Sequence, residues 1–488
     1  MVGASERRSW RVGVSRSQLA YGAVLVAITA VAVESGYEAA VGGDKLLMVV
    51  PAAALAGIFL CALGLVNFEA FAFTTIVIRS SLDITRPQLG NNGAAGIGTA
   101  SASGLDPAGA LAVIFMLAGL FWWLARHRAG VKSPPPSVHR IALIFFATVG
   151  YVSVIDSAQP FVSVLEAIRV SAVAAMLAVM EVLLVDRAAV RRLITSIYLS
   201  SLVPILVTFF FLAQHHPQFA SGGFGRYQGT FSQPNPFAIY LTMLIVMGAA
   251  LIPHISSRRR LMLIPLLLAC TVCLYYTYTR SAWVATIIGL FAVAIIGRRK
   301  ILLGVLIAGV VFSLVAVPSV AQRFADLGSN QVNTNGNTSN SLTWRFDYWG
   351  TVLPLADKNP ITGIGLKMSS FETTQAKEPH NDFLRSYVEE GAVGVVAYLT
   401  LLLSMFLVAR QSLRESAPGF DRSIAVGFAG CVIAFLIISV VSNVITEVIV
   451  LWYYVAFAAA AYAVTQYRKP EYANLRQMPT RLAPREAS

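Results

Sequence analysis

Long apolar runs separated by short polar segments dominate the pattern of the 488-residue chain. The runs are about 17–23 residues long, and each is long enough to cross a hydrocarbon core of about 30 Å. Inside lipid, backbone amides must hydrogen-bond within their own segment, so runs of this kind form helices. The pattern therefore predicts an all-α protein, a polytopic bundle of transmembrane helices.

Fourteen apolar runs are candidate spans. They are 19–35, 46–64, 68–82, 108–126, 139–156, 162–185, 193–212, 235–254, 261–279, 282–297, 301–318, 388–410, 423–442 and 446–466. The run 68–82 is short and carries Glu69 and Arg79, and the run 282–297 follows Arg280 almost without a loop. The sequence thus predicts 12 to 14 spans.

Composition and charge agree with a membrane protein. Hydrophobic residues make up 56% of the chain and charged residues 12%, whereas charged residues are about a quarter of a soluble domain. The net charge is +13, and the basic residues form short clusters between the apolar runs. With the N-terminus in the cytoplasm, alternation of the spans puts every cluster inside, as the positive-inside rule requires. We therefore predict that both termini are cytoplasmic and that the chain binds no nucleic acid, which would need a contiguous basic stripe.

The runs divide the chain into five parts. We predict a cytoplasmic N-terminal tail (1–18), the first part of the bundle (19–318), a large outer loop (319–387), the last three transmembrane helices (388–466) and a cytoplasmic C-terminal tail (467–488). Loops as long as 319–387 are usually functional or disordered.

Two halves of the long loop differ in character. The segment Gly328–Ser341 is rich in Asn, Gly, Ser and Thr, which predicts a mobile chain. The second half is different, because apolar and aromatic residues recur at helical spacing, namely Trp344, Tyr348, Trp349, Val352 and Leu355. This spacing predicts an amphipathic helix that lies on the bundle or in the membrane interface.

Two arginines at the outer mouth of the bundle are candidate anion ligands. Arg226 lies between glycines in GRYQGTFSQPN, where its planar guanidinium could bind a phosphate through two hydrogen bonds. Arg280 lies in YYTYTRSAW at membrane depth, where a charge normally faces a polar cavity or a partner. Arg226 fits a lipid-interface anchor equally well, and the tyrosines beside Arg280 fit an interface belt.

The long loop adds three candidates. Arg323 follows a predicted helix end, and Arg345 lies on the predicted amphipathic helix, where an exposed ion pair with Asp347 is the alternative to a binding role. His380 and Asn381 lie in the first turn of a predicted helix. A histidine there can act as base, acid or hydrogen-bond donor near neutral pH, or it can be structural.

Inside the bundle, Glu166, Arg169, Glu181 and Glu447 are compatible with a proton relay or with structural ion pairs. The four cysteines lie in apolar runs, which favours packing thiols over a disulfide framework or a zinc site. No GxxxxGK[ST], HExxH or DxD sequence occurs. Nothing therefore indicates a nucleotide motor, a zinc protease or a metal-dependent nucleotide-sugar transferase.

Two spaced patterns occur in the outer segments. The pattern H-[NSQ]-x9-G-x-x-[GTY] is met by His380, Asn381, Gly391 and Gly394, and R-x3-L is met by Arg323 and Leu327. Through these patterns, and through RYQGTFSQPN, YTRSAW and NPITGIGL, the chain resembles the O-antigen ligase family of the O-antigen ligase/polymerase superfamily. The resemblance covers about residues 220–400.

The resemblance implies about 12 helices in the bacterial inner membrane, with a large periplasmic loop and a periplasmic active site. It implies that a completed glycan moves from undecaprenyl diphosphate to a sugar hydroxyl of lipid A-core, with inversion and without a metal or cofactor. The partners would then be this donor, this acceptor and membrane lipids. The implied catalytic residues are His380, which would receive or polarise the proton of the attacking hydroxyl, with Arg226 and Arg280. The implied substrate contacts are Arg345, Arg323, Asn381 and Gln228.

Three alternatives remain. An O-antigen polymerase or a protein O-oligosaccharyltransferase of the same superfamily would differ in its acceptor. A secondary transporter would use Glu166, Arg169 and Glu447 as a relay, but the sequence shows no internal repeat of the kind transporters commonly have. The polar residues gather on one side, which favours an enzyme at the outer leaflet.

Overall fold

The computed structural model describes residues 57, 59–85, 107–131, 134–221, 224–316, 341–375 and 377–469. The chain divides into two compact units, Met1–Leu60 and Cys61–Ser488, and the helices and strands named below belong to the second. The predicted span 19–35, most of the span 46–64, most of the segment Gly328–Ser341 and Arg323 lie outside the described residues.

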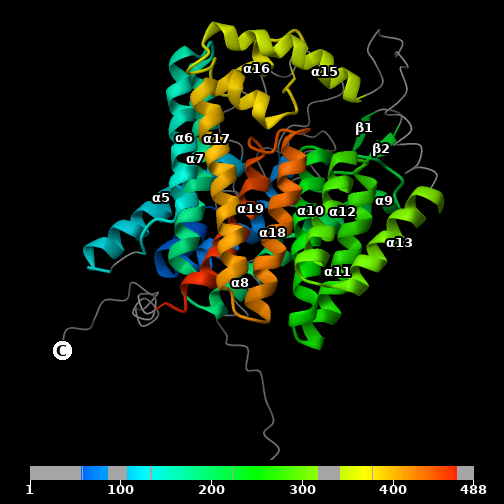
Figure 1. Ribbon diagram of the computed structural model, residues 1–488. Helices are drawn as coiled ribbons and strands as arrows, with labels where there is room; N and C mark the ends of the chain where they lie inside the picture. The colour runs from blue at the N-terminus through cyan, green and yellow to red at the C-terminus, as the bar shows by residue number, and fades with distance from the viewer. Residues whose placement is uncertain are drawn as a thin grey trace, which may run out of the picture. The chain divides into compact units, whose positions relative to one another are not determined.

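The described chain is almost entirely helical (Figure 1). Its α-helices are α3 (Phe68–Arg79), α5 (Pro107–Arg128), α6 (Val138–Val152), α7 (Pro160–Leu183), α8 (Arg187–Ser200), α9 (Leu202–Ala213), α10 (Pro234–Leu251), α11 (Ser257–Tyr276), α12 (Arg280–Ile296), α13 (Lys300–Ala316), α15 (Ser341–Val352), α16 (Met368–Phe371), α17 (Asp382–Glu415), α18 (Phe420–Ser439) and α19 (Val448–Gln466). Short 3-10 helices are η1 (Leu82–Thr85), η2 (Ser153–Asp156), η3 (Ile252–His254) and η5 (Leu353–Lys358). Strands β1 (Phe219–Ser221) and β2 (Phe224–Arg226) form one antiparallel pair, in which Phe219 lies opposite Arg226.

Nine helical segments within the described ranges are long and apolar enough to cross a membrane. The chain is therefore an all-α, multi-pass membrane protein, as predicted. Helix α3 has 12 residues and a length of about 18 Å, which is shorter than a hydrocarbon core, so the predicted span 68–82 is not a complete crossing on its own. Helix α12 has 17 residues and also falls below the length of the nine. The predicted total of 12 to 14 spans stays a prediction.

The predicted span 193–212 corresponds to two helices, α8 and α9, that meet at Ser201. Helix α8 begins at Arg187, earlier than predicted, because Asp186 caps it: the Asp186 side chain accepts a hydrogen bond from the backbone N–H of Ala189 (2.6 Å). The first turn of α8 is polar, so hydrophobicity alone does not reveal it.

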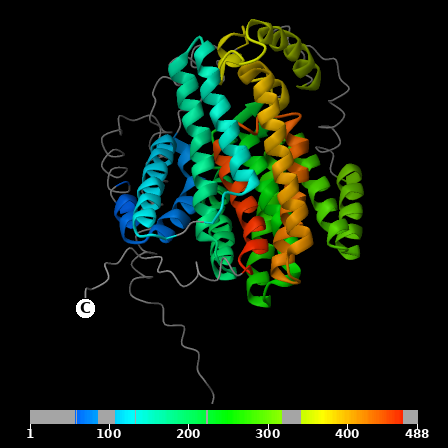
Figure 2. The ribbon, with the colours of Figure 1, turned by 60° about the vertical axis from the view of Figure 1, so that its left-hand side comes forward.

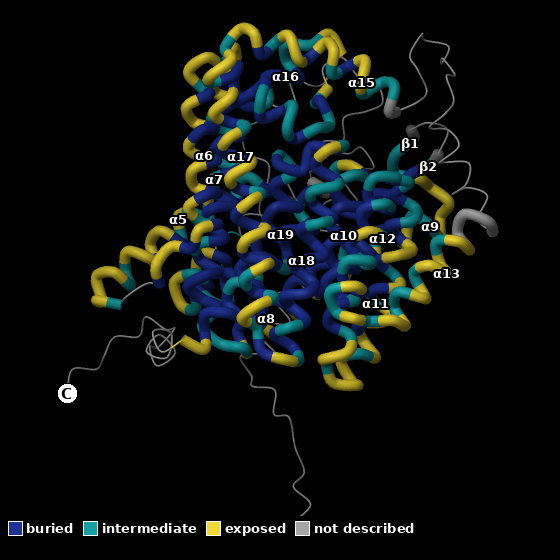
Figure 3. Tube along the Cα trace, in the orientation of Figure 1, coloured by how far each residue is buried: buried dark blue, intermediate teal, exposed yellow. Residues whose placement is uncertain are grey.

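Helix α19 forms the centre of the bundle. Its side chains are buried along nearly its whole length, and it contacts α3, α7, α8, α10, α17 and α18. Helix α18 packs in turn against α10 and α12. Figure 3 shows α10, α18 and α19 largely in the colour of buried residues. Large exposed apolar side chains, such as Leu261 of α11 and Ile301 of α13, lie on outer helices, as expected where a protein meets lipid.

The bundle has two ends. We call the end where α10, α12, α17 and α19 begin the site end, and the opposite one the far end. At the far end, Asp421 at the start of α18 pairs with Arg187 at the start of α8 (2.7 Å) and with Arg468 after α19 (3.1 Å). His254, directly after α10, contacts the Ser423 hydroxyl there (2.7 Å). These contacts fix the direction of the helices relative to one another.

The described part of the long loop packs across the site end (Figures 1 and 2). Tyr348 and Val352 of α15 and Ala356 of η5 are buried against Met368 of α16 and Val388 of α17. The opposite face of α15 is exposed at Phe346. The predicted amphipathic helix is thus confirmed, and it lies on the bundle.

Helix α17 bends sharply at Gly391, whose φ of 69° and ψ of −164° are not helical. At this bend the segment 360–366 runs beside α17, and their backbones hydrogen-bond: Ile364 N–H to Val388 O (3.0 Å) and Ala392 N–H to Pro360 O (2.9 Å). A Cβ added at Gly391 would lie 2.2 Å from the carbonyl oxygen of Ile361. The glycine is required by its backbone conformation and by this close approach.

Candidate active site

His380 lies directly before α17, and α15 holds the chain that leads to it. The Trp349 indole N–H donates to the carbonyl of Pro379 (2.6 Å), and the Tyr348 hydroxyl donates to the carbonyl of Lys377. The ring of Trp344 meets the His380 ring edge-on, with 5.8 Å between the ring centres. His380 itself has a φ of 52°, in the left-handed region that few non-glycine residues adopt. The aromatic side chains of α15 therefore fix the position of His380.

Asn381 caps α17. Its side-chain oxygen accepts hydrogen bonds from the backbone N–H groups of Phe383 (3.0 Å) and Leu384 (3.1 Å). This role explains an Asn at the position, and the predicted substrate contact of Asn381 stays a prediction.

The connection between α18 and α19 packs behind His380. Asn443 lies with its amide nitrogen 3.2 Å from Nδ1 of His380, and the backbone N–H of Ile445 donates to Asp382 (3.2 Å). Sequence analysis missed Asn443, because it lies between two predicted spans and 63 residues away from His380. Its only signal in the sequence is a pair of polar residues, Ser442 and Asn443, between two apolar runs.

The surroundings of His380 favour its neutral form. Burial and the nearby Arg345 cation lower the pKa of His380 to about 4. Lys377 and Arg385 act in the same direction, whereas Glu378 opposes them. Arg345 and His380, predicted separately, are thus brought together. Near pH 7 the imidazole is neutral and lies among cations.

Arg385, one turn into α17, is a buried residue that sequence analysis missed. It forms ion pairs with Glu389 (2.9 Å) and Glu378 (2.9 Å), and it donates to the hydroxyl of Thr446 (2.8 Å). Glu389 also accepts a hydrogen bond from the backbone N–H of Lys367 (2.6 Å). This network fastens three segments to the start of α17, and a charge pattern one helical turn apart is its signal in the sequence.

Arg226, at the end of β2, is largely buried and bound by the protein itself. Its Nε donates to the carbonyl of Thr277 (2.6 Å), and one terminal nitrogen donates to Thr279 (2.8 Å) and Asn235 (2.8 Å). Arg226 thus joins the β-hairpin to the start of α10 and to the turn between α11 and α12. Phosphate binding by Arg226 stays a prediction. The structure adds a second role for Arg226, which is to hold this turn.

Arg280 is the first residue of α12, directly after that turn. Gln228, two residues after Arg226, is 1% exposed, and its side-chain oxygen is buried without a hydrogen-bond partner among the described residues. Gly229 follows with a φ of 60°, and a Cβ there would lie 2.8 Å from the Pro204 carbonyl oxygen. The glycine after Gln228 therefore belongs to a tight turn.

The residues around His380 and the residues around Arg226 and Arg280 both lie at the site end. Helices α10, α12, α17 and α19 begin there, whereas α6, α9, α11 and α18 end there, so the partial charges of the helix ends are of both signs. Arg280 and Arg345 add full positive charges. Such charges favour an anionic ligand, and a diphosphate is a ligand of this kind.

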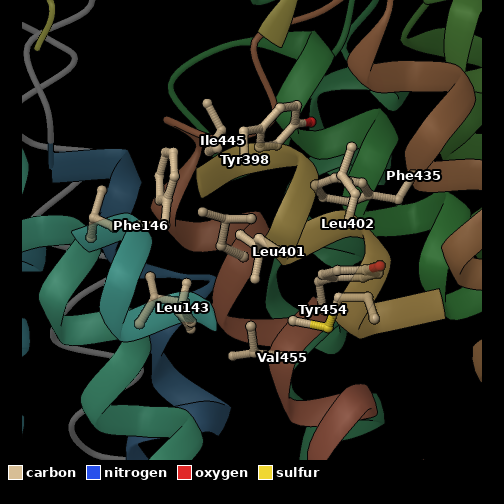
Figure 4. A pocket seen from close by; sticks show the side chains of 13 residues that line it. Leu143, Phe146, Tyr398, Leu401, Leu402, Phe435, Ile445, Tyr454 and Val455 are labelled. Carbon is tan, nitrogen blue, oxygen red and sulfur yellow. The ribbon is translucent and has the colours of Figure 1, made fainter. Parts of the chain in front are cut away.

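A small apolar cavity lies deeper in the bundle, between α6, α7, α17, α18 and α19 (Figure 4). Leu143, Phe146, Leu401, Phe435 and Tyr454 are among the side chains that line it. Tyr398 also lines it and donates a hydrogen bond to Asp382 at the start of α17 (3.2 Å). Apart from Tyr398 and Tyr454 the lining is apolar, and it carries no arginine, histidine or carboxylate that would suit a diphosphate.

A family model described as O-antigen ligase matches residues 264–399 of the chain. None of the curated proteins compared with the chain matches it. The matched range begins in α11 and ends in α17, and it contains Arg280, Arg345 and His380, while Arg226 lies outside it. It also contains the bend at Gly391 and the segment 360–366 that packs on it. Residues 264–399 are therefore similar to the O-antigen ligase family.

Proposed function

We propose that this protein is an inner-membrane glycosyltransferase that moves O-antigen glycan from undecaprenyl diphosphate to a sugar hydroxyl of lipid A-core. The observation that carries the proposal is the position of His380. It stands neutral beside Arg345 at the site end, inside the segment that matches the family. The arginines at this end, Arg280 and Arg345, suit a diphosphate donor.

The reaction is a displacement at the anomeric carbon of the glycan. The bond from this carbon to the diphosphate oxygen breaks, the diphosphate leaves with the electron pair, and the acceptor hydroxyl oxygen bonds to the carbon from the opposite face. Inversion follows from a single displacement. Arginine side chains can neutralise the charge that develops on the leaving diphosphate, so we propose that no metal ion is needed.

We propose Arg280 and Arg345 as diphosphate ligands, together with Arg226, which also holds the turn that precedes Arg280. We further propose Gln228, Asn381 and Arg323 as substrate contacts. The unpartnered oxygen of Gln228 supports this for a sugar hydroxyl, which can donate a hydrogen bond to it.

We propose that the site end faces the periplasm and that both termini are cytoplasmic. The distribution of basic residues supports this orientation. The clusters at the start of α8, at the start of α11 and after α12 all lie at the far end, namely Arg187, Arg191 and Arg192; Arg258, Arg259 and Arg260; and Arg298, Arg299 and Lys300. Basic clusters of this kind mark the cytoplasmic side.

Three of the four charged residues considered for a proton relay have local partners. Arg169 pairs with Glu166 one turn away (3.0 Å), and Glu181 is bound by Ser137 and lies 3.1 Å from His139. Glu166 and Glu181 are about 22 Å apart along α7, as judged from the rise of a helix. These contacts favour structural ion pairs over a relay.

A deletion strain tests the proposed function. Loss of the protein should leave long lipid-linked glycan and unmodified lipid A-core, and the wild-type gene should restore the modified lipid. An O-antigen polymerase would instead leave single repeats attached to lipid A-core, and an enzyme acting on proteins would leave lipopolysaccharide unchanged. Either result would contradict the proposal.

A further inference from the structure

Asn443 contacts His380 through a defined pair of atoms. Its amide nitrogen lies 3.2 Å from Nδ1 of His380, and Asn443 is only 4% exposed. In this orientation of the amide, the nitrogen carries two hydrogens and only donates, so Nδ1 accepts the hydrogen bond. A neutral imidazole that accepts at Nδ1 carries its proton on Nε2.

The ring holds a single proton near neutral pH. The charged groups that act on it are Arg345 of α15, Lys377 and Glu378 of the preceding segment, and Arg385 of α17. Three of these four are cations, and burial adds to their effect, so the imidazolium form is disfavoured. The contact with Asn443 then determines which nitrogen carries the proton.

Two contacts beside Asn443 fix the backbone of the α18–α19 connection. Ile445 donates to Asp382, and Thr446 accepts from Arg385 (2.8 Å). The Asn443 side-chain oxygen is buried and has no hydrogen-bond partner among the described residues. Among the described residues, the hydrogen bond to His380 therefore sets the orientation of the Asn443 side-chain amide.

We propose that Asn443 is a positioning residue that holds His380 with its proton on Nε2, so that His380 meets the substrate as a hydrogen-bond donor and not as a base. The identity of its partner, an oxygen of the departing diphosphate, rests on the proposed function. His380 transfers no proton in this role. The acceptor hydroxyl, on the face of the sugar opposite the diphosphate, gives its proton to a water molecule while the bond from the anomeric carbon to the diphosphate breaks.

Nitrogen NMR of the histidine rings tests the proton position without any assay of activity. The full-length protein in nanodiscs is labelled with ¹⁵N-histidine, and His380→Gln identifies the signals of His380 among the 6 histidines. We expect a protonated Nε2 and an unprotonated Nδ1 at pH 7. In Asn443→Asp the carboxylate can only accept a hydrogen bond, so the proton should move to Nδ1 or the ring should become charged.

A wild-type ring with its proton on Nδ1 would overturn the proposal, as would ring signals that Asn443→Asp leaves unchanged. Ser442→Ala is the matched control, since Ser442 is the buried neighbour of Asn443, and it should keep the wild-type signals. Size-exclusion chromatography confirms that each variant is folded before it is compared.

Glycan transfer by the same variants tests the donor role. Asn443→Asp and Asn443→Ala should each transfer at least about tenfold more slowly than wild type, with an unchanged KM for the donor. Transfer at the wild-type rate by Asn443→Asp would show that a base at Nε2 suffices, and it would overturn the donor role. Failure of the proposed function is distinguishable, because wild type would then transfer no glycan while the NMR result stands.

Discussion

At the residue scale, the chemistry of the site depends on groups that hold His380 and on charges that surround it. Trp349 and Tyr348 bind the backbone before His380, and Asn443 binds its ring. The Arg345 cation and burial keep the ring neutral. In the proposed mechanism, Arg226, Arg280 and Arg345 supply the positive charge that a diphosphate requires.

Replacement of His380 by Ala should reduce glycan transfer by about 100-fold or more, because the site loses a group that acts in the transition state. In the wild type, a pKa lowered from 6.5 to about 4 means that the neutral ring persists to lower pH. Activity should therefore stay constant from about pH 8 to pH 5 and fall toward pH 4. An acid limb with its midpoint at about pH 6.5, the value of an unperturbed histidine, would contradict this.

Replacement of Arg280 by Lys should slow transfer by about tenfold or more, because an ammonium group cannot form the paired hydrogen bonds of a guanidinium with a phosphate. Initial rates with purified variants measure this. Arg258→Lys is the matched control, since Arg258 is an exposed arginine at the far end, and it should keep the wild-type rate. Equal rates for Arg280→Lys and wild type would remove Arg280 from the site.

Sequence reasoning singles out His380, Arg280 and Arg345 as candidates, because such side chains are unusual in the outer segments of a membrane protein. It could not find Asn443 or the contact of Arg385 with Thr446, since both depend on segments about 60 residues apart in the chain. The hydrogen bonds of Arg226 could not be predicted either, because they form only when β2 meets the turn between α11 and α12.

At the element scale, the bend in α17 sets where the site lies. Hydrophobicity alone predicts a span that begins at residue 388. Helix α17 begins earlier, at Asp382, because its first turn is polar and is capped by Asn381. The helical spacing in 344–355 correctly predicts α15, because its buried and exposed faces differ. The short strands β1 and β2 have three residues each and carry no alternation long enough to recognise.

Replacement of Gly391 by Ala should destabilise the protein by about 2 kcal/mol or more, because the backbone conformation is strained for other residues and the new Cβ meets the Ile361 carbonyl. Thermal unfolding in detergent measures the effect, and glycan transfer should fall with it. Gly350→Ala in α15 is the matched control: a Cβ there meets nothing within 4 Å. A wild-type melting temperature for Gly391→Ala would show that the bend is not required.

At the scale of the whole molecule, the two ends of the bundle differ in chemistry. The site end carries His380 and Arg280, while the far end carries the basic clusters. The alternation of apolar runs and basic clusters predicts this asymmetry from the sequence. The helix count is harder to predict, because α3 is shorter than a full crossing and α8 and α9 share one apolar run.

Excess EDTA should leave glycan transfer unchanged, because the proposed site neutralises the diphosphate with arginines. The measurement compares rates before and after chelation and after addition of Mg²⁺ or Mn²⁺. Loss of transfer with EDTA, restored by either metal, would contradict the metal-independent mechanism.

The most direct measurement reconstitutes the purified protein in nanodiscs with undecaprenyl-diphosphate glycan and lipid A-core. We expect a product in which the glycan is joined to lipid A-core with the inverted anomeric configuration, formed by wild type and not by His380→Ala. No product with lipid A-core, together with transfer to a second lipid-linked glycan or to a protein acceptor, would contradict the proposed function.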